Sequence, residues 1–166
     1  MIFDNNLIFS NAQAAAFTVS TASTNVIDLE GGVAMNIGVG TRYGADLGRG
    51  DGVAIPKIAC FIGTALTSTN SATLQVAFQG STDSTTWDTY VQSGLITAAN
   101  LTAGAKIAAW DWPQVPSQFS LPRYVRLYYQ VATGVFATGS IGLAGIVLQR
   151  ADNNVGSYPE AFTVGP

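Results

Sequence analysis

The sequence predicts an all-β protein, folded as an antiparallel sandwich or barrel of about eight strands in one domain. Three observations lead to this prediction. Apolar and polar residues alternate with a period of two over several short segments, the pattern of half-buried strands. Turn-forming residues separate these segments at fairly regular intervals, without a helical period between them. Lys and Glu, which solubilise exposed helix faces, occur only at Lys57, Lys106, Glu30 and Glu160 of 166 residues.

The clearest strand pair lies in the middle of the chain. In ATLQVAFQG the side chains of Leu74, Val76 and Phe78 alternate with polar or small ones, and STDSTT, residues 81–86, supplies a turn. WDTYVQSG, which begins at Trp87, alternates again. The two segments are predicted to form a hairpin.

The other predicted strands are short runs bounded by Gly, Pro, Asn or Ser. They are residues 23–29 (STNVIDL), 33–40 (VAMNIGVG), 53–66 (VAIPKIACFIGTAL), 105–110 (AKIAAW), 123–134 (RYVRLYYQVATG) and 140–150 (SIGLAGIVLQR). Pro56 cannot donate to a ladder and indicates an edge or a strand end. Residues 113–122 hold three prolines and are predicted to be an irregular connection. Thr41 to Gly52 is predicted to be an exposed, mobile loop without a metal.

The two ends of the chain, residues 1–16 and 151–166, are predicted to be extended arms, with at most one helical turn near Asn11 to Ala16. Both ends contain apolar residues but lack a strand period. Such residues dock either on the core of their own chain or on a neighbouring chain. The residues concerned are Phe3, Leu7, Phe9, Tyr158 and Phe162.

The composition argues against several classes of function. The net charge is −3 with 10% charged residues and no basic stripe, so nucleic-acid binding lacks the cations on which it depends. The chain has no His and one Cys, which removes the commonest general base and the usual zinc ligands. We therefore expect no enzyme activity, no metal and no cofactor.

The lone Cys60 lies in the apolar segment KIACFIG and is expected to be a buried thiol, which suits synthesis in a reducing cytosol. The N-terminal segment contains no Lys or Arg and does not resemble a secretory signal. No run of about 18 apolar residues occurs, so we expect no membrane partner.

RYVRLYYQVATG is predicted to be a strand with two unlike faces. Side chains alternate along a strand, so one face is core and contains Val125, Leu127, Tyr129 and Val131. The opposite face presents Tyr124, Arg126, Tyr128 and Gln130. Because aromatic residues and Arg are enriched where proteins meet proteins, this face is predicted to contact another chain.

Two Trp residues and an acid allow other interpretations. Trp110 and Trp112 could form a flat platform on which a carbohydrate stacks. The alternative is that Trp87 packs in the core, while Trp110 and Trp112 pack against the Pro-rich connection, residues 113–122. Asp111, between the two, could be a glycosidase carboxyl or a solvated acid at a strand end.

Several segments together resemble a known family. The pattern MxxDxxLxxSxAQA over residues 1–14 is followed by STNVIDL, NIGVG, LQVAFQGSTD, RYVRLYYQVATGVFATGSI and GIVLQ. In this order they resemble the small capsid cement, or decoration, proteins of short-tailed bacteriophages, a jelly-roll family first described from a Bordetella phage. The resemblance covers nearly the whole chain and departs from the family pattern at residues 41–56 and 152–166.

The resemblance implies a jelly-roll sandwich that forms a homotrimer on the outer surface of an icosahedral virion and stabilises contacts between major capsid subunits. It implies no catalysis, and it implies synthesis in the cytoplasm of a host bacterium. The partners are then the phage major capsid protein and further copies of the chain. The subunit or capsid interface would comprise Tyr124, Arg126, Tyr128 and Gln130, and the capsid-contacting arms would use Phe3, Leu7, Phe9, Tyr158 and Phe162. A carbohydrate-binding sandwich that uses Trp110 and Trp112 is the alternative.

Overall fold

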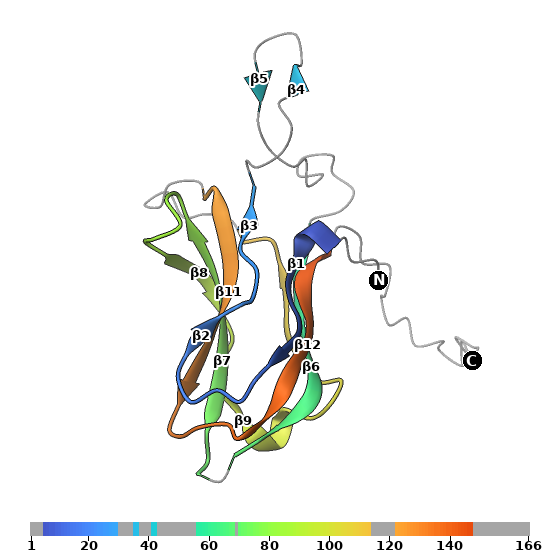
Figure 1. Cartoon of the computed structure of the whole chain (residues 1–166), viewed down its shortest axis with the longest axis vertical. Coiled ribbons are helices and arrows are strands. Elements are labelled where there is room, and N and C mark those ends of the chain that lie inside the picture. Colours follow the sequence, from blue (N-terminus) through green and yellow to red (C-terminus); the bar gives the residue numbers. More distant parts are fainter. Residues whose placement is uncertain are drawn as a thin grey trace, which may run out of the picture.

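Antiparallel strands, packed as a sandwich of two sheets, make up nearly all the regular structure of the protein (Figure 1). The computed structural model describes residues 5–29, 35–36, 41–42, 56–68, 70–113 and 122–147. Its two helical segments are single 3-10 turns, η1 (Asn5–Leu7) and η2 (Ala98–Asn100). Within the described residues no helix has the length and apolar character needed to cross a membrane.

Sheet A forms one wall of the sandwich and contains four strands in the order β1-β12-β6-β10. Their bounds are β1 (Ile8–Ala14), β6 (Lys57–Thr67), β10 (Lys106–Asp111) and β12 (Thr138–Val147). All neighbours are antiparallel. The last described strand of the chain therefore lies between the first strand and β6.

Sheet B forms the other wall, with the order β2-β11-β7-β8; β3 continues along β11, and β9 continues along β7. The bounds are β2 (Thr21–Ala22), β3 (Ile27–Asp28), β7 (Thr73–Ser81), β8 (Asp88–Gln92), β9 (Ile96–Thr97) and β11 (Tyr124–Ala132). The two central strands, β7 and β11, pair without a bulge, from Tyr124 opposite Ser81 to Ala132 opposite Thr73.

The connectivity of the two sheets is that of a jelly roll. If β2 with β3, and β8 with β9, are each counted as one interrupted strand, the sandwich has eight strands. Numbered along the chain, these run 1-8-3-6 in sheet A and 2-7-4-5 in sheet B, an arrangement of two interlocked Greek keys. The predicted antiparallel jelly-roll sandwich is confirmed. Between β3 and β6 the chain adds a small hairpin, β4 (Met35–Asn36) with β5 (Thr41–Arg42); residues 43–52 of the predicted loop lie outside the described residues.

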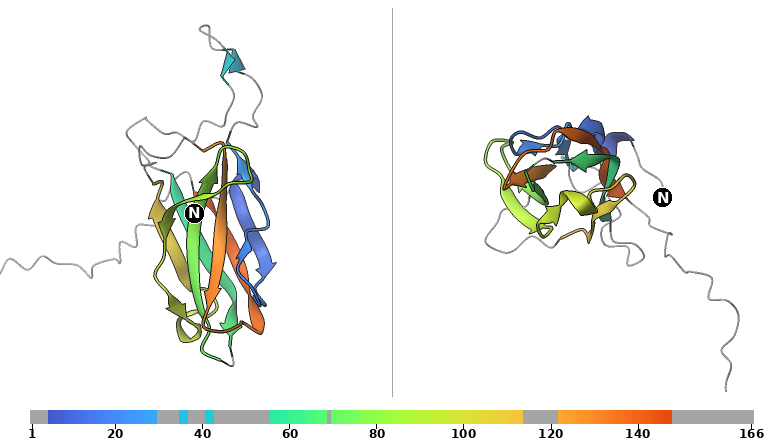
Figure 2. Two further views of the ribbon diagram at one scale, coloured as in Figure 1. Left: turned by 90° about the vertical axis from the view of Figure 1, so that its left-hand side faces the viewer. Right: turned by 90° about the horizontal axis from the view of Figure 1, so that it is seen from below.

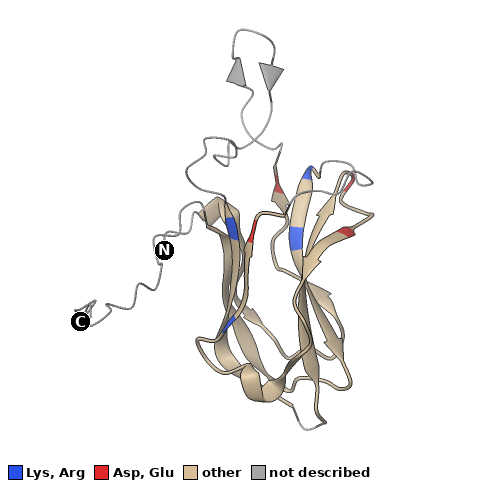
Figure 3. Ribbon diagram, turned by 180° about the vertical axis from the view of Figure 1, so that it is seen from behind, with Lys and Arg blue, Asp and Glu red and all other residues tan. Residues whose placement is uncertain are grey.

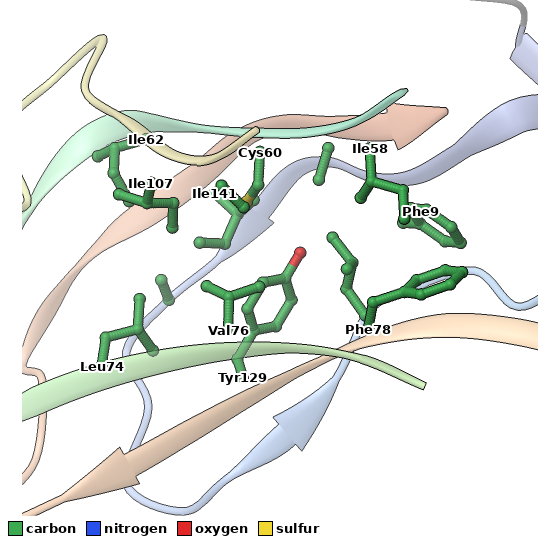
Figure 4. Close-up of a cluster of buried hydrophobic side chains, with 14 of the residues drawn as sticks. Phe9, Ile58, Cys60, Ile62, Leu74, Val76, Phe78, Ile107, Tyr129 and Ile141 are labelled. Carbon is green, nitrogen blue, oxygen red and sulfur yellow. The ribbon is translucent and has the colours of Figure 1, made fainter. Parts of the chain in front are cut away.

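The core lies between the two sheets, which Figure 2 shows end-on, and the close-up in Figure 4 shows side chains of both sheets pointing into it. The alternating apolar residues predicted for β7 and β11 point inward: Leu74, Val76, Phe78, Val125, Leu127 and Tyr129 are each 0% exposed. Sheet A supplies the opposite layer, including Ile58, Cys60, Ile62 and Ile141. Full burial of each large aliphatic side chain contributes about 1.5–3 kcal/mol. Cys60 is buried as predicted, and burial raises the pKa of its thiol to about 12.

The prediction that residues 1–16 form an extended arm is wrong over the part that the structure describes, residues 5–16. Residues 8–14 form β1, an edge strand of sheet A, in place of a helical turn near Asn11 to Ala16. Leu7 is 7% exposed and Phe9 0%, and the Phe9 ring packs edge-on against Phe78 of the opposite sheet. The two side chains therefore belong to the core of their own chain, and the prediction that they contact a capsid is corrected. Phe3, Tyr158 and Phe162, with residues 151–166, lie outside the described residues.

Of the strand predicted over residues 23–29, only Ile27–Asp28 (β3) forms a strand, because the residues before it turn toward sheet A. Asn25 donates its backbone N–H to the carbonyl of Phe9 and its side-chain amide to the carbonyl of Ile8. Ser23 maintains the contact with β11: its backbone N–H donates to the carbonyl of Leu127, and its Oγ accepts from the Leu127 N–H at 3.2 Å. Residues 23–26 thus join the edges of the two sheets.

Two glycines allow β6 and β12 to approach closely in sheet A. A Cβ at Gly63 would lie 2.8 Å from the Cα of Gly142 and 2.6 Å from the Oγ of Ser140. A Cβ at Gly142 would likewise lie 2.7 Å from the Cα of Gly63. Any larger residue at either position would force the strands apart.

Candidate interaction face

The residues of β11 that point away from the core form the candidate site. The predicted alternation is confirmed: Tyr124, Arg126, Tyr128 and Gln130 are all half-buried, between the fully buried Val125, Leu127 and Tyr129. Val131, predicted as core, is half-buried and packs against the core. We call the solvent side of sheet B the outer face and define it by Gln75, Gln79, Trp87, Thr89, Tyr124, Arg126, Tyr128 and Gln130.

Strand β7 supplies the floor beside these side chains. Gln79 pairs with Arg126, Ala77 with Tyr128, and Gln75 with Gln130 across the ladder. Although Gln79 points to the outer face, it is only 7% exposed. It accepts a hydrogen bond from Nε of Arg126 at 2.9 Å and donates one to Oγ1 of Thr89 at 3.2 Å. A buried polar side chain with both partners satisfied holds its neighbours in one geometry.

Trp87 also belongs to this face and not to the core, which corrects the prediction that it packs inside. The guanidinium carbon of Arg126 lies 3.9 Å from the centroid of the Trp87 ring and 5.2 Å from that of Tyr128. The indole N–H of Trp87 donates to the carbonyl of Ser84 at 3.2 Å, which fixes the ring at the start of β8. Cation–π contacts of this kind stabilise by about 0.5–1 kcal/mol or more when partly desolvated.

A bulge explains why sequence reasoning missed Trp87. The ladder between β7 and β8 shifts register between Phe78 and Gln79, so Tyr90 is an additional residue in β8. Tyr90 turns inward and its ring packs edge-on against Phe78. Simple alternation along residues 87–92 cannot anticipate such an insertion. The position of Gln79, in contrast, follows from the alternation, because Gln79 is the polar residue next to the inward-facing Phe78 in the predicted strand.

Arg123, which directly precedes β11, differs from Arg126 because its partner is an acidic residue. Arg123 makes a two-pronged contact with Asp28 of β3, with Nε to Oδ1 and Nη2 to Oδ2 both at 3.0 Å. Its guanidinium carbon lies 4.9 Å from the centroid of Tyr124. The pair ties the end of β3 to the end of β11, so Asp28 is structural here.

Trp110 and Trp112, the residues of the carbohydrate alternative, both pack against the core while remaining half-buried. The Trp112 ring lies edge-on to Phe78, with centroids 5.3 Å apart. Asp111 between them forms an exposed ion pair with Lys57. The part of the chain that the structure describes contains no group of three or more His, Cys, Asp or Glu placed to hold a metal ion.

Charge is distributed unevenly over the sandwich. Figure 3 shows that most of the charged residues coloured on the ribbon lie toward the end of the sandwich where β3 lies. The ion pairs Lys57–Asp111 and Arg123–Asp28 join strands there. The outer face carries one of the positive charges, Arg126.

The fold and its outer face define a class: a jelly-roll protein with an aromatic and arginine face on one sheet. The chain matches the model of the Bbp16 family over residues 9–145, and it belongs to that family. The family is phage-derived and takes its name from a protein of a Bordetella phage. The matched segment begins in β1 and ends in β12, so it spans the whole sandwich. No curated protein matches the chain.

Proposed function

We propose that this protein is a capsid cement protein, which binds the outer surface of an icosahedral phage head and stabilises contacts between major capsid subunits. The observation that carries the proposal is the outer face, in which Arg126, Trp87 and Tyr128 form one stacked cluster that is still half-exposed. Arg, Trp and Tyr are the residues that most often dominate the binding energy of protein interfaces. Membership of a phage-derived family supports the same conclusion.

The mechanism is that of a clamp. A stable protein interface buries about 1,200–2,000 Å² in total, which one face of a small sandwich can supply. We propose that three copies associate and that each copy contacts a different capsid subunit, so that individually modest contacts combine through avidity. Since only the assembled lattice presents all the sites together, binding stabilises the shell and not the free subunits.

The test uses expanded heads of the encoding phage that lack this protein. Purified protein should co-sediment with the heads in a saturable ratio and raise the temperature at which they release DNA. Light scattering should give the mass of a trimer before heads are added. No binding, or binding without a gain in heat resistance, would overturn the proposal.

The carbohydrate-binding alternative is weaker. A sugar stacks on an exposed aromatic face, whereas both Trp110 and Trp112 pack against the core. Replacing either Trp by Ala should therefore reduce stability before it alters any affinity for glycans.

A further inference from the structure

The guanidinium of Arg126 is held in a fixed orientation, and its two terminal amino groups are available to a ligand. Trp87 and Tyr128 lie against the guanidinium, and Nε donates to Gln79. Gln79 is in turn held by its hydrogen bond to Thr89. Within the described residues, the two terminal amino groups of Arg126 make no hydrogen bond. The side chain is thus preorganised, and a ligand that used these amino groups would avoid much of the entropy cost of ordering it.

The other cations of sheets A and B are differently placed. Lys57 is paired with Asp111, and Arg123 makes a two-pronged contact with Asp28. Lys106 is exposed to solvent on the other sheet. Arg126 is half-buried and has no carboxylate partner within the part of the chain that the structure describes. Burial lowers the pKa of Arg126 from its ordinary value, whereas Tyr128 raises it.

The surroundings favour one small anion over a polyanion. The chain is acidic overall, with net charge −3. Polyanions such as nucleic acids bind through many cations at once, whereas the eight residues that define the outer face include one cation, Arg126. A planar carboxylate matches the two parallel N–H groups that Arg offers at its free edge.

We propose that Arg126 is the docking point for a single carboxylate, from an Asp or Glu side chain of the protein to which this chain binds. The carboxylate accepts two hydrogen bonds from the terminal amino groups of Arg126, at the side of the guanidinium flanked by Trp87 and Tyr128. That the partner is the major capsid protein rests on the proposed function; the presence of a carboxylate site does not.

The site itself is tested without a capsid. The full chain, with isotope-labelled arginine, is titrated with glutarate at constant ionic strength, and the side-chain NMR signals of Arg126 are followed. Glutarate should shift these signals saturably, an effect that chloride lacks. The signals of Arg126 are identified by their absence from the spectrum of Arg126→Gln. Glutarate no more effective than chloride would overturn the proposal, as would tighter binding of inorganic phosphate.

The role in docking is tested on expanded heads. Arg126→Gln should weaken binding about 30-fold or more, the usual effect of removing one partner of a desolvated charge pair. Arg126→Lys keeps the charge but loses the planar fork and should weaken binding about 10-fold or more. The control Lys106→Gln removes one positive charge from the other sheet and should leave the affinity within about two-fold.

The results separate the two proposals. Equal binding of wild type and Arg126→Lys would overturn the carboxylate site while leaving the cement function intact. Failure of the wild type to bind heads would overturn the cement function, and the glutarate titration would still decide the site. If Arg126→Gln dissociated the trimer in the absence of heads, the carboxylate would come from a second copy of the chain, which would contradict the proposal. Thermal unfolding of each variant is the control that tests whether the fold is retained.

Discussion

The hydroxyl oxygen of Tyr129 in β11 lies 2.8 Å from Oγ of Ser10 in β1, so one hydrogen bond crosses the core from sheet B to sheet A. Ser10 donates its own proton to Oε1 of Gln13 at 2.6 Å, so Tyr129 is the donor in this bond. The Tyr129 hydroxyl also interacts with the buried thiol of Cys60, whose pKa it lowers against the larger effect of burial. Figure 4 shows that hydroxyl pointing from its sheet toward the other. These links set how the two sheets are aligned.

Tyr129→Phe should lower the free energy of unfolding by about 1–2 kcal/mol, because a buried hydrogen bond is lost while the ring is kept. Urea unfolding followed by circular dichroism measures the change. Ser10→Ala should have a similar effect, and the double variant should lose less than the sum of the two. Strictly additive effects would show that the two hydroxyls do not act together.

Phe9→Ala should lower the free energy of unfolding by about 3–5 kcal/mol, as expected when a fully buried aromatic ring is removed. Val19→Ala is the control, since Val19 is 70% exposed, and its effect should stay within about 0.5 kcal/mol. The contrary result, a stable Phe9→Ala protein that fails to bind heads, would return the residue to a capsid-contacting arm.

Gly63→Ala should destabilise the protein by about 1–3 kcal/mol, because the new methyl group would overlap the backbone of Gly142. Gly94→Ala provides the comparison: a Cβ there meets nothing within 4 Å, and stability should change by about 0.5 kcal/mol or less. Differential scanning calorimetry of the two variants would reveal the contrast. Equal melting temperatures would argue against the close approach of β6 and β12.

Asp83→Asn should make the free energy of unfolding depend less steeply on pH in the acid range. The Thr85 side chain, the backbone N–H groups of Thr86 and Thr85, and the Ser81 hydroxyl hydrogen-bond to Asp83 and hold the pKa of its carboxyl well below its ordinary value. Because the folded-state pKa is lower than the unfolded one, the stabilisation is complete above about pH 5 and is lost as pH falls below about 4. Urea midpoints of wild type should therefore drop more steeply over this acid range. Parallel curves would contradict the prediction.

Local patterns predicted the inner and outer faces of β7 and β11 correctly, because strand periodicity depends only on neighbouring residues. The side chains of Tyr124, Arg126, Tyr128 and Gln130 were placed on the solvent side from alternation alone. Cys60 was likewise placed in the core from its apolar neighbours. The jelly-roll topology came from the resemblance to a family and not from periodicity.

The remaining features depend on contacts between distant segments. Leu7 and Phe9 were predicted in an arm, since nothing near them in the sequence indicates that β1 pairs with residues 140–145. Trp87 reaches Arg126 only because of the bulge at Tyr90. The strand predicted over residues 23–29 is shortened because Asn25 bonds to β1 through its backbone N–H and its side-chain amide. None of these contacts has a local signal.

The position of β12 between β1 and β6 has a consequence for synthesis on the ribosome. β1 emerges first, but its pairing partner, in which Gly145 lies opposite Ile8, is translated last among the described strands. Until then, β1 and β6 each expose an unpaired edge on which another nascent chain could add a strand. Contacts so distant along the chain also slow the folding reaction. We therefore expect folding to be largely post-translational, with yield more sensitive to expression temperature than native stability alone would suggest.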